Sequence, residues 1–455
     1  MKDTICAIST PAGMGAIALI RISGNNAWNC IEDCFIRRDK KTEIIPQKTY
    51  FGEFYDEQNL LDQVLITYFK SPHSFTGEDM IEISCHGSLY IQKRILEILI
   101  DKGCRFAKSG EFTMRAFMNG KMDLSQAEAV AEVIAADSKA ALGLAMKHLR
   151  GGFSSKIKKL REQLLQFTSL LELELDFSEE DVEFADRAHF RELILQLKSY
   201  VSNLINSFQL GNAIKNGVSV AIIGKPNAGK STLLNALLNE DRAIVSEIAG
   251  TTRDTIEETL NINGILFRLI DTAGIREHAT DAIEKMGVEK SLERMRNANI
   301  VACLFDVNET TNEDIFLQKK LFEQENIQYI LVGNKIDELK EKNIAEKFTE
   351  KNMLFISAKE KQKIDDLKQQ LYKIAVGNSI NTENTIVTNA RHHAALLKIE
   401  ESLNDIEDGI KNCLSGDLLA IDIRRALHYL GEITGQVEID RDILGAIFGK
   451  FCIGK

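Results

Sequence analysis

The chain has 455 residues, about three times the length of a typical single domain, so the sequence predicts about three domains that each bury a core. Its composition is 44% hydrophobic and 27% charged with four prolines, which excludes collagen-like, proline-rich and largely disordered proteins. A formal net charge of -11 excludes a protein that coats nucleic acid with a general positive field, so any RNA contact is expected to be local.

The compartment and redox state follow from what the sequence lacks. Met1–Cys6 shows no charged and apolar leader, and no window reaches the ~18 uninterrupted apolar residues of a membrane span, so we expect a cytoplasmic protein with no membrane span. The eight cysteines lack the C-x-x-C pairs of zinc ribbons and the density of secreted scaffolds. We therefore expect reduced core thiols, with Cys452 as the exception because it is the fourth residue from the end.

The first region, residues 1–118, alternates short apolar runs with one helical stretch and predicts a small α+β domain. The expected elements are strands at Ile5–Ile8, Ile17–Ile22, Val64–Phe69 and Ile81–Cys85 and a helix at Leu89–Ile100.

The second region, residues 119–215, has helical spacing. Ser125 and Glu128 match a capping box at its start. Apolar residues then repeat at three and four positions, namely Ile157, Leu160, Leu164, Phe167 and Leu171. The acidic run at 179–183 is interpreted as a solvated loop, and helical spacing resumes over Phe190–Phe208.

The third region, residues 216–375, changes to apolar runs separated by helices, which is typical of a parallel sheet with crossovers. The expected strands are Val218–Ile223, Leu266–Ile270, Ile300–Phe305, Tyr329–Val332 and Met353–Ile356. Residues 376–455 return to helical spacing at Arg391–Asp408 and Leu418–Leu430. The predicted fold is therefore a multidomain α/β plus all-α chain, in which the parallel-sheet domain is inserted between two halves of a helical domain.

A glycine-rich motif follows the first strand of the third region. Gly224–Ser231 matches G-x4-G-K-S/T at a strand-to-helix turn. Backbone N–H groups of such a loop surround phosphates, Lys230 supplies positive charge to the β and γ groups, and Ser231 offers a hydroxyl to Mg²⁺. The alternative is a glycine-rich turn that binds nothing.

Three further motifs follow in order: Asp271–Gly274, Asn334–Asp337 and Ser357–Lys359. Together with the glycine loop they resemble the Ras-like GTPase set. The resemblance implies that Asp337 accepts two donors from guanine, so that the nucleotide is GTP. It also implies that Asp271 reaches Mg²⁺ through water, that the Gly274 amide senses the γ-phosphate, and that Thr252 completes the Mg²⁺ shell.

Hydrolysis is where the sequence departs from that set. Ile275 stands where Ras-like enzymes have a water-orienting glutamine, and an aliphatic side chain cannot orient water. Glu284 is a candidate for this role, and its alternative is a surface residue. Asn227, together with carbonyls from Ser246 to Thr251, is a candidate for holding a monovalent cation where an arginine finger would otherwise act.

The chain closes with Phe451–Lys455. Cys452 formally occupies a C-a-a-X position, but glycine is not aliphatic, lysine is an unusual last residue and no polybasic stretch precedes it. Prenylation is therefore disfavoured, and the simplest alternative is a frayed tail.

Over residues 4–455 the chain resembles the family of tRNA modification GTPases called MnmE or TrmE. Besides the GTPase motifs, the residues that carry the resemblance are Thr4-Ile5, Thr10–Gly13, Arg21–Gly24, Ser74–Asp79, Gly110–Thr113, Arg115–Phe117, Lys121–Leu124, Gly250–Asp254 and Cys452–Lys455. The terminal tetrapeptide and the domain order make it specific.

The resemblance implies a homodimer formed through N-terminal domains that bind a tetrahydrofolate derivative, the 5-formyl or 5,10-methylene form. It implies a heterotetramer with the FAD protein MnmG. The pair would install an aminomethyl or carboxymethylaminomethyl group at C5 of the wobble uridine of certain tRNAs, with GTP, Mg²⁺ and K⁺ as cofactors.

The resemblance also assigns residues. The folate contacts are Arg21, Glu82, Lys121 and Lys455, although Arg21 and Glu82 could equally be a surface pair. The catalytic residues are Glu284, Lys230 and Cys452, and the role of Cys452 stays open. The metal ligands are Ser231 and Thr252 for Mg²⁺ and Asn227, Ser246, Ile248 and Thr251 for K⁺. The GTP-binding residues are Asn227, Ala228, Gly229, Lys230, Ser231, Thr232, Ser246, Glu247, Ile248, Ala249, Gly250, Thr251, Thr252, Asp271, Thr272, Ala273, Gly274, Asn334, Lys335, Asp337, Ser357 and Ala358.

Three positions depart from the family pattern. Ser246 replaces a usual threonine, Met14–Ala16 lacks a usual arginine, and one residue is inserted between Gly274 and Glu284. Two other functions were weighed. A ribosome-assembly GTPase predicts a basic module after the sheet domain, but residues 381–455 hold 8 Lys/Arg and 12 Asp/Glu. A purely regulatory switch without folate chemistry stays open at this point.

Overall fold

The computed structural model describes ten stretches of the chain: residues 3–38, 44–176, 187–241, 258–271, 295–338, 347–348, 353–376, 385–412, 414–436 and 441–454. They divide into two compact units. The first contains residues 1–135, 145–194 and 401–455, and the second contains residues 136–144 and 195–400. Each unit therefore combines segments that lie far apart in the sequence.

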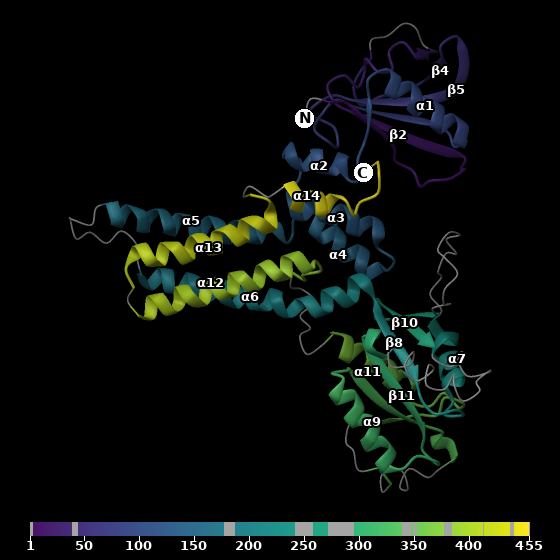
Figure 1. Ribbon diagram of the computed structural model, residues 1–455, viewed down its shortest axis with the longest axis vertical. Helices are drawn as coiled ribbons and strands as arrows, with labels where there is room; N and C mark the ends of the chain where they lie inside the picture. Colours follow the sequence, from purple (N-terminus) through teal and green to yellow (C-terminus); the bar gives the residue numbers. More distant parts are fainter. Residues whose placement is uncertain are drawn as a thin grey trace. The chain divides into compact units, whose positions relative to one another are not determined.

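A seven-stranded sheet forms the N-terminal part of the first unit, in the order β3-β4-β5-β6-β2-β1-β7 (Figure 1). Its strands are β1 (Ile5–Ile8), β2 (Ile17–Ser23), β3 (Phe35–Arg37), β4 (Thr49–Asp56), β5 (Asn59–Phe69), β6 (Met80–His86) and β7 (Arg105–Phe106). All neighbours are antiparallel except β1 and β7, which are parallel.

Strand periodicity gives this sheet one core face. Ile81, Ile83 and Cys85 of β6 are buried, whereas the alternate residues of the same strand are partly or fully exposed. The buried face packs against α1 (Leu89–Asp101), whose Ile95 and Leu99 are fully buried. The other face of β6 is therefore the side on which polar groups can meet a ligand.

The cysteines behave as the sequence predicts. Among the described residues, Cys6, Cys30, Cys34, Cys85, Cys104 and Cys303 are buried free thiols, and Cys452 is exposed. Burial raises the pKa of the Cys85 thiol to about 11 and that of Cys303 to about 12, so neither is a reactive thiolate at neutral pH. Cys413 lies outside the described residues.

Two helices follow the sheet, α2 (Glu111–Met118) and α3 (Leu124–Ala135). The capping box expected at Ser125 and Glu128 is wrong, because Ser125 already lies inside α3. Asp123 caps the helix instead: its Oδ1 accepts from the Gln126 N–H at 3.0 Å, and Gln126 Oε1 accepts from the Asp123 N–H at 3.0 Å. Aspartate is as good an N-cap as serine, so the reciprocal pair formed two residues earlier.

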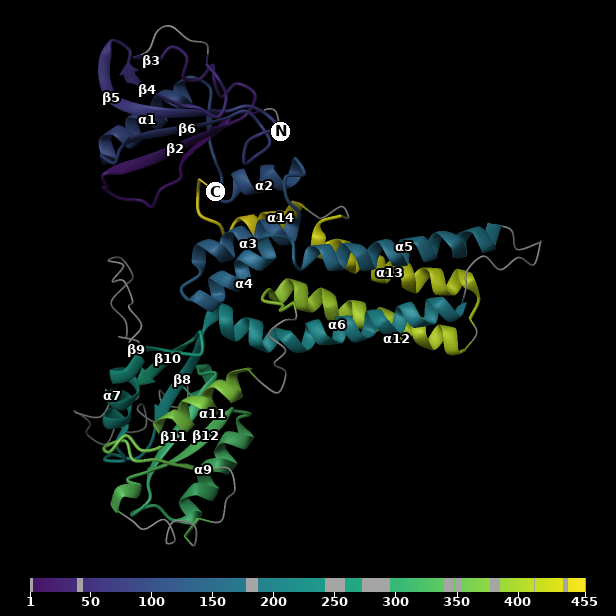
Figure 2. The same ribbon diagram turned by 180° about the vertical axis from the view of Figure 1, so that it is seen from behind.

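The remaining helices of the helical region lie on both sides of the third region in sequence. They are α4 (Lys139–Leu149), α5 (Ser154–Asp176), α6 (Arg187–Asn216), α12 (Ala390–Lys411), α13 (Gly416–Thr434) and α14 (Arg441–Phe448). Within the first unit α5 and α13 lie side by side, as Figure 2 shows. Each buries an apolar stripe, such as Ile157 and Leu164 on α5 and Ile423 and Leu430 on α13.

The second unit contains a six-stranded sheet in the order β13-β12-β11-β8-β10-β9. Its strands are β8 (Val218–Ile223), β9 (Glu258–Ile262), β10 (Ile265–Asp271), β11 (Ile300–Asp306), β12 (Tyr329–Asn334) and β13 (Met353–Phe355). Only β9 runs antiparallel to its neighbour. The helices described with it are α7 (Lys230–Asp241), α9 (Asn312–Gln324), η3 (Ile336–Glu338) and α11 (Ile364–Val376).

These elements confirm the predicted fold class, a Ras-like parallel sheet inserted in a helical region and preceded by a small α+β region. Every expected strand and helix is present, while β3, β4, β7, β9 and α14 were not anticipated. The acidic run at 179–183 lies outside the described residues. None of the described helices combines the length and apolarity that a membrane span requires.

The capping pair yields a direct test. Asp123→Ala removes the N-cap acceptor of α3 and the 2.8 Å ion pair with Lys158, so we expect the free energy of opening α3 to fall by about 1–2 kcal/mol. Hydrogen exchange at the Gln126 and Ala127 amides measures this loss. Ser125→Ala is the matched control, and a larger effect there than at Asp123 would restore the Ser125 box.

Candidate functional site

All predicted nucleotide motifs of the second unit lie at one edge of its sheet. β8, β10, β11, β12 and β13 are parallel, so their carboxyl ends share an edge, and the glycine loop, Asp271, Asn334 and Ser357 each sit at or just after one of these ends. Open parallel sheets bind ligands outside the carboxyl ends of their strands. The sequence therefore placed these motifs correctly, and they converge.

The glycine loop connects β8 to α7, and close backbone approach explains its glycines. Gly224 has φ 155° and Gly229 has φ 94°. A Cβ at Gly224 would overlap the Leu304 carbonyl oxygen, and one at Gly229 would overlap the amide nitrogen of Asn334. Both positions thus need glycine, and the loop is pressed against β11 and β12.

Lys230 begins α7 and points back over the loop. Its Nζ donates to the Gly224 carbonyl at 2.9 Å and to the Lys225 carbonyl at 3.0 Å. This holds a positive charge at the start of a helix, where backbone N–H groups also favour anions. Ser231, Thr232 and Asn227 are exposed beside it. The arrangement suits a polyphosphate.

Asn334 connects the phosphate side to the base side of the site. Its Nδ2 donates to the Ala228 carbonyl at 2.8 Å, and its Oδ1 accepts from the Ala358 N–H at 2.9 Å. The side chain is 2% exposed, so both bonds are shielded from water. One buried amide therefore sets the spacing between the glycine loop and the Ser357–Ala358 loop.

Asp337 is held by the same loop. Ser357 donates its hydroxyl to Asp337 Oδ1 at 2.6 Å, and the Glu360 N–H donates to Ser357 Oγ at 3.1 Å. Asp337 is nevertheless exposed, so its carboxylate is oriented and accessible. This is the geometry required to accept paired donors from a purine edge.

A residue that the sequence reasoning missed fixes Lys335. Asp306, at the end of β11, pairs with Lys335 Nζ at 2.6 Å. Burial opposes ionisation of Asp306, but the Lys335 ammonium and the Asn308 backbone N–H outweigh it and hold the pKa of this carboxyl below its ordinary value. The acid follows a buried apolar strand, which is the signal that could have identified it.

The residues expected to contact the γ-phosphate and the cations fall outside the described residues. They are Ser246, Glu247, Ile248, Ala249, Gly250, Thr251, Thr252, Thr272, Ala273, Gly274, Ile275 and Glu284. Only the backbone of Asp271 is described there, and it pairs with Ile222 of β8.

The first unit brings three of the four predicted folate contacts to one loop. Arg21 on β2 and Glu82 on β6 are direct register partners, and Arg21 Nε donates to Glu82 Oε1 at 2.8 Å. The Arg21 guanidinium also lies 5.7 Å from the Phe75 ring centre. Lys121 Nζ donates to the Pro72 carbonyl at 2.8 Å. Phe75 and Pro72 belong to the segment 70–79, while Lys455 lies outside the described residues.

The end of the chain is docked on the N-terminal sheet, so the frayed-tail alternative is wrong. Ser9 Oγ donates to the Gly454 carbonyl at 2.9 Å, and the Gly110 N–H donates to the Cys452 carbonyl at 3.4 Å. Gly454 has φ 91°, and a Cβ there would overlap the Ile8 carbonyl oxygen. The exposed thiol of Cys452 is thereby carried on a fixed backbone beside β1.

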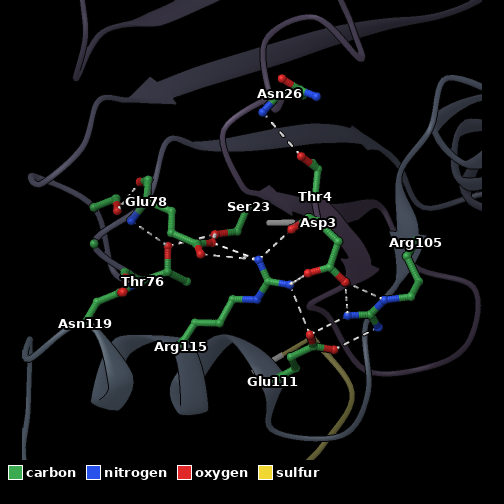
Figure 3. Close-up of polar contacts among 12 residues, drawn as sticks. Asp3, Thr4, Ser23, Asn26, Thr76, Glu78, Arg105, Glu111, Arg115 and Asn119 are labelled. Carbon is green, nitrogen blue, oxygen red and sulfur yellow. Dashed lines mark hydrogen bonds and ion pairs between the residues drawn. The ribbon is translucent and has the colours of Figure 1, made fainter. Parts of the chain in front are cut away.

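A buried arginine anchors the segment 70–79, as Figure 3 shows. The Arg115 side chain is 1% exposed and donates to Asp3 at 3.0 Å, Glu78 at 3.0 Å and Glu111 at 3.1 Å. Arg105 shares Asp3 and Glu111 with it. The network thus joins the start of the chain, the segment 70–79 and α2.

The carboxylates of this network are stabilised as anions. Hydrogen bonding from Arg105 holds the pKa of Asp3 below its ordinary value. Burial opposes ionisation of Glu111, but the hydrogen bonds from Arg105, the Lys108 N–H and Arg115 outweigh it and lower the pKa of Glu111.

The glycine loop, the Asn334 amide and the oriented Asp337, on a sheet of Ras-like strand order, define a P-loop GTP-binding protein. Family models extend this to the rest of the chain: residues 4–121 match "GTP-binding protein TrmE N-terminus" and residues 124–452 match "MnmE helical domain".

Several relatives are similar along the whole length. A tRNA modification GTPase MnmE of Flavobacterium psychrophilum is 53% identical over 462 residues, which cover 100% of this chain and 99% of the relative. Those of Cytophaga hutchinsonii and Christiangramia forsetii are 52% and 48% identical, and cover 100% of this chain and 98% and 100% of the relative. The chain belongs to the MnmE family of tRNA modification GTPases.

The docked tail predicts an effect at Gly454. Gly454→Ala should force the tail off β1, because the new methyl group meets a backbone carbonyl, and an overpacked site typically costs about 1–3 kcal/mol. We expect the Phe451 and Cys452 amides to exchange roughly tenfold faster or more. Gly103→Ala is matched in backbone, with φ 95° and no atom near the added Cβ, and should leave the tail unchanged. Equal exchange in both variants would contradict the docking.

The lowered carboxyl pKa values predict acid sensitivity of the first unit. A group with a lowered folded pKa stabilises the fold above its unfolded pKa, and this contribution is lost as the pH falls. The free energy of unfolding should therefore fall below about pH 5, followed by fluorescence of Trp28, the single tryptophan of the chain.

Glu111→Gln should lower that free energy by about 3 kcal/mol at pH 7 and flatten its pH dependence, because two buried guanidinium groups lose a charged partner. Glu97→Gln is the control. Glu97 pairs with Arg94 at an exposed site, where the expected change is at most about 0.5 kcal/mol. A pH profile of Glu111→Gln that parallels the wild type would refute this role.

Proposed function

We propose that this protein hydrolyses GTP and uses the GTP cycle to support modification of tRNA. The observation that carries the proposal is the buried Asn334 amide, which joins the glycine loop to the Ser357–Ala358 loop beside an oriented Asp337. The names of the full-length relatives support the tRNA part. In this proposal residues 216–375 act as the G domain, and residues 119–215 and 376–455 act as the two halves of the helical domain.

The chain's own residues account for nucleotide binding. Lys230 and the N–H groups of the glycine loop bind the phosphates, and Asp337 accepts from the guanine edge. Ser231 offers an exposed hydroxyl at the start of α7, a hard oxygen donor that fits Mg²⁺, and Thr252 is proposed as the second protein ligand. Bound Mg²⁺ supplies charge neutralisation at the phosphates.

Potassium is proposed as the cation that replaces an arginine finger. Asn227 has φ 65° and is exposed within the glycine loop, so its side-chain carbonyl fits an oxygen-ligated alkali metal. Ser246, Ile248 and Thr251 are proposed as the other ligands. Glu284 is proposed to orient the attacking water, since Ile275 cannot.

The proposed one-carbon chemistry rests on the first unit. Arg21 and Glu82 place a cation and a carboxylate side by side, which suits the donor edge of a pterin and the anionic tail of a tetrahydrofolate derivative. Lys121 and Lys455 are proposed as further contacts, and Cys452 as a thiol presented to the same region. We propose that residues 1–118 also form the homodimer and that the FAD protein MnmG is the partner that completes the wobble-uridine reaction.

The potassium assignment predicts a difference between alkali metals. GTP turnover in potassium buffer should exceed turnover in sodium buffer of equal ionic strength by about tenfold or more, because one well-placed charge is worth about 2.7–4 kcal/mol at the transition state. Asn227→Ala should remove the difference, whereas Asn216→Ala, at an exposed helix position, should retain it. Equal rates of the wild type in both buffers would refute the ion.

The experiment that tests the function is mass analysis of the wobble nucleoside in tRNA from cells with and without this protein. Loss of the C5 substituent on deletion, restored by the wild type and not by Lys230→Ala, is the expected result. Unchanged nucleosides in the deletion strain would overturn the tRNA assignment while leaving GTP hydrolysis to be measured separately.

A further inference from the structure

An exposed histidine at the end of β6 is held by a buried carboxylate that the proposed function does not use. His86 Nδ1 lies 2.6 Å from Asp62 Oδ1, and the His86 backbone N–H donates to Asp62 Oδ2 at 2.8 Å. The Gln63 N–H also donates to Asp62 Oδ1 at 2.8 Å. The Asp62 side chain is 6% exposed and that of His86 is 69% exposed.

This geometry fixes the proton on one ring nitrogen. Because a carboxylate only accepts hydrogen bonds, Nδ1 of His86 must donate to Asp62, and the lone pair of the neutral ring is then on Nε2. Among the described residues no side chain or backbone group bonds Nε2. The ring is thus an oriented base whose reactive nitrogen is accessible, with a carboxylate placed to stabilise the imidazolium that forms on protonation.

The position of His86 on the sheet gives this base a substrate. Glu82, Ser84 and His86 share the open face of β6, opposite the buried Ile81, Ile83 and Cys85. In the register of β2 and β6, Arg21 pairs with Glu82, Leu19 with Ser84 and Ile17 with His86. Four strand residues span about 13 Å. A ring lying over Leu19 and Ser84 therefore has the Arg21–Glu82 pair on one side and the imidazole on the other.

We infer that His86, positioned by Asp62, is the proton-transfer residue for substitution at C5 of the uridine ring. This rests on the proposed function. When an electrophilic carbon from the tetrahydrofolate donor forms a bond to C5, the hydrogen already on C5 must leave as a proton. Nε2 of His86 uses its lone pair to take that proton, the C–H electron pair returns to the ring, and the Asp62 carboxylate faces the resulting imidazolium. The step is redox-neutral, so it needs no oxidant.

A purely structural role for the pair is separable from this one. Asp62 accepts two backbone N–H groups whatever the side chain at position 86, so His86→Gln removes the imidazole and keeps those bonds. Asp62→Asn keeps one acceptor oxygen and removes the charge that fixes the tautomer. His428→Gln is the matched control, because His428 forms a histidine–carboxylate pair with Glu432 at 3.1 Å on a helix away from the sheet.

The experiment uses the full chain with the flavoprotein partner, GTP, 5,10-methylenetetrahydrofolate and a tRNA transcript carrying tritium at C5 of the wobble uridine. Release of tritium to water reports the proton step itself. For His86→Gln we expect release to fall about 100-fold or more, the usual contribution of a general base, with unchanged GTP turnover and folate affinity. Asp62→Asn should lose at least about tenfold, and His428→Gln should match the wild type.

Release by His86→Gln within about threefold of the wild type would overturn the inference alone, because such a change is below the contribution of a general base. No release by the wild type would refute the proposed function and the inference with it. Should His86→Gln fold poorly, His86→Asn is the second variant. ¹⁵N spectra of histidine-labelled wild type give an independent check: a proton on Nδ1 of His86 supports the inference, and a proton mainly on Nε2 contradicts it.

Discussion

The Arg115 guanidinium is the constraint on which the first unit depends. A buried cation is expensive unless carboxylates match it, so Asp3, Glu78 and Glu111 must come to it from three separate segments. The segment 70–79 is thereby fixed, and with it the Phe75 ring beside Arg21 and the Pro72 carbonyl that receives Lys121. The proposed folate side of the sheet is consequently a product of the polar interior beneath it.

The second unit solves the same problem with a neutral group. The Asn334 amide is buried and satisfied at both ends, and it spans from the glycine loop to the Ser357–Ala358 loop. Since Gly229 leaves no room for a side chain against it, the spacing of phosphate and base contacts is set by packing as well as by hydrogen bonds. Binding can then select a preformed distance between the two ends of a nucleotide.

The sequence predicted what is encoded locally. Buried strands were recognisable as continuous apolar runs, and the nucleotide motifs were recognisable because loop chemistry demands glycine, lysine and asparagine at fixed spacings. β9 was missed because its text, Glu258–Ile262, mixes polar and apolar residues, and β3 and β7 were missed because they are very short. The Asp123 cap was missed because two overlapping capping patterns compete at the start of α3.

Long-range contacts left no local signal at all. Nothing near Gly454 announces that it will lie against Ile8, and nothing near Asp62 announces that it will hold His86. Such pairs are decided by the register of the sheet and by the path of the returning chain. Candidate residues that depend on a motif were therefore found from the sequence, and those that depend on a partner distant in the chain required the structure.

The pairing of α5 with α13 has a consequence for biosynthesis. α5 is translated before the G domain and α13 after it, so at ~5–20 residues per second α13 leaves the ribosome roughly ten to fifty seconds after the helix it must cover. During that interval the apolar stripe of α5, which includes Ile157 and Leu164, has no permanent cover. The inserted domain thus imposes a delay on its host, and chaperone capture of the nascent chain is most needed in that window.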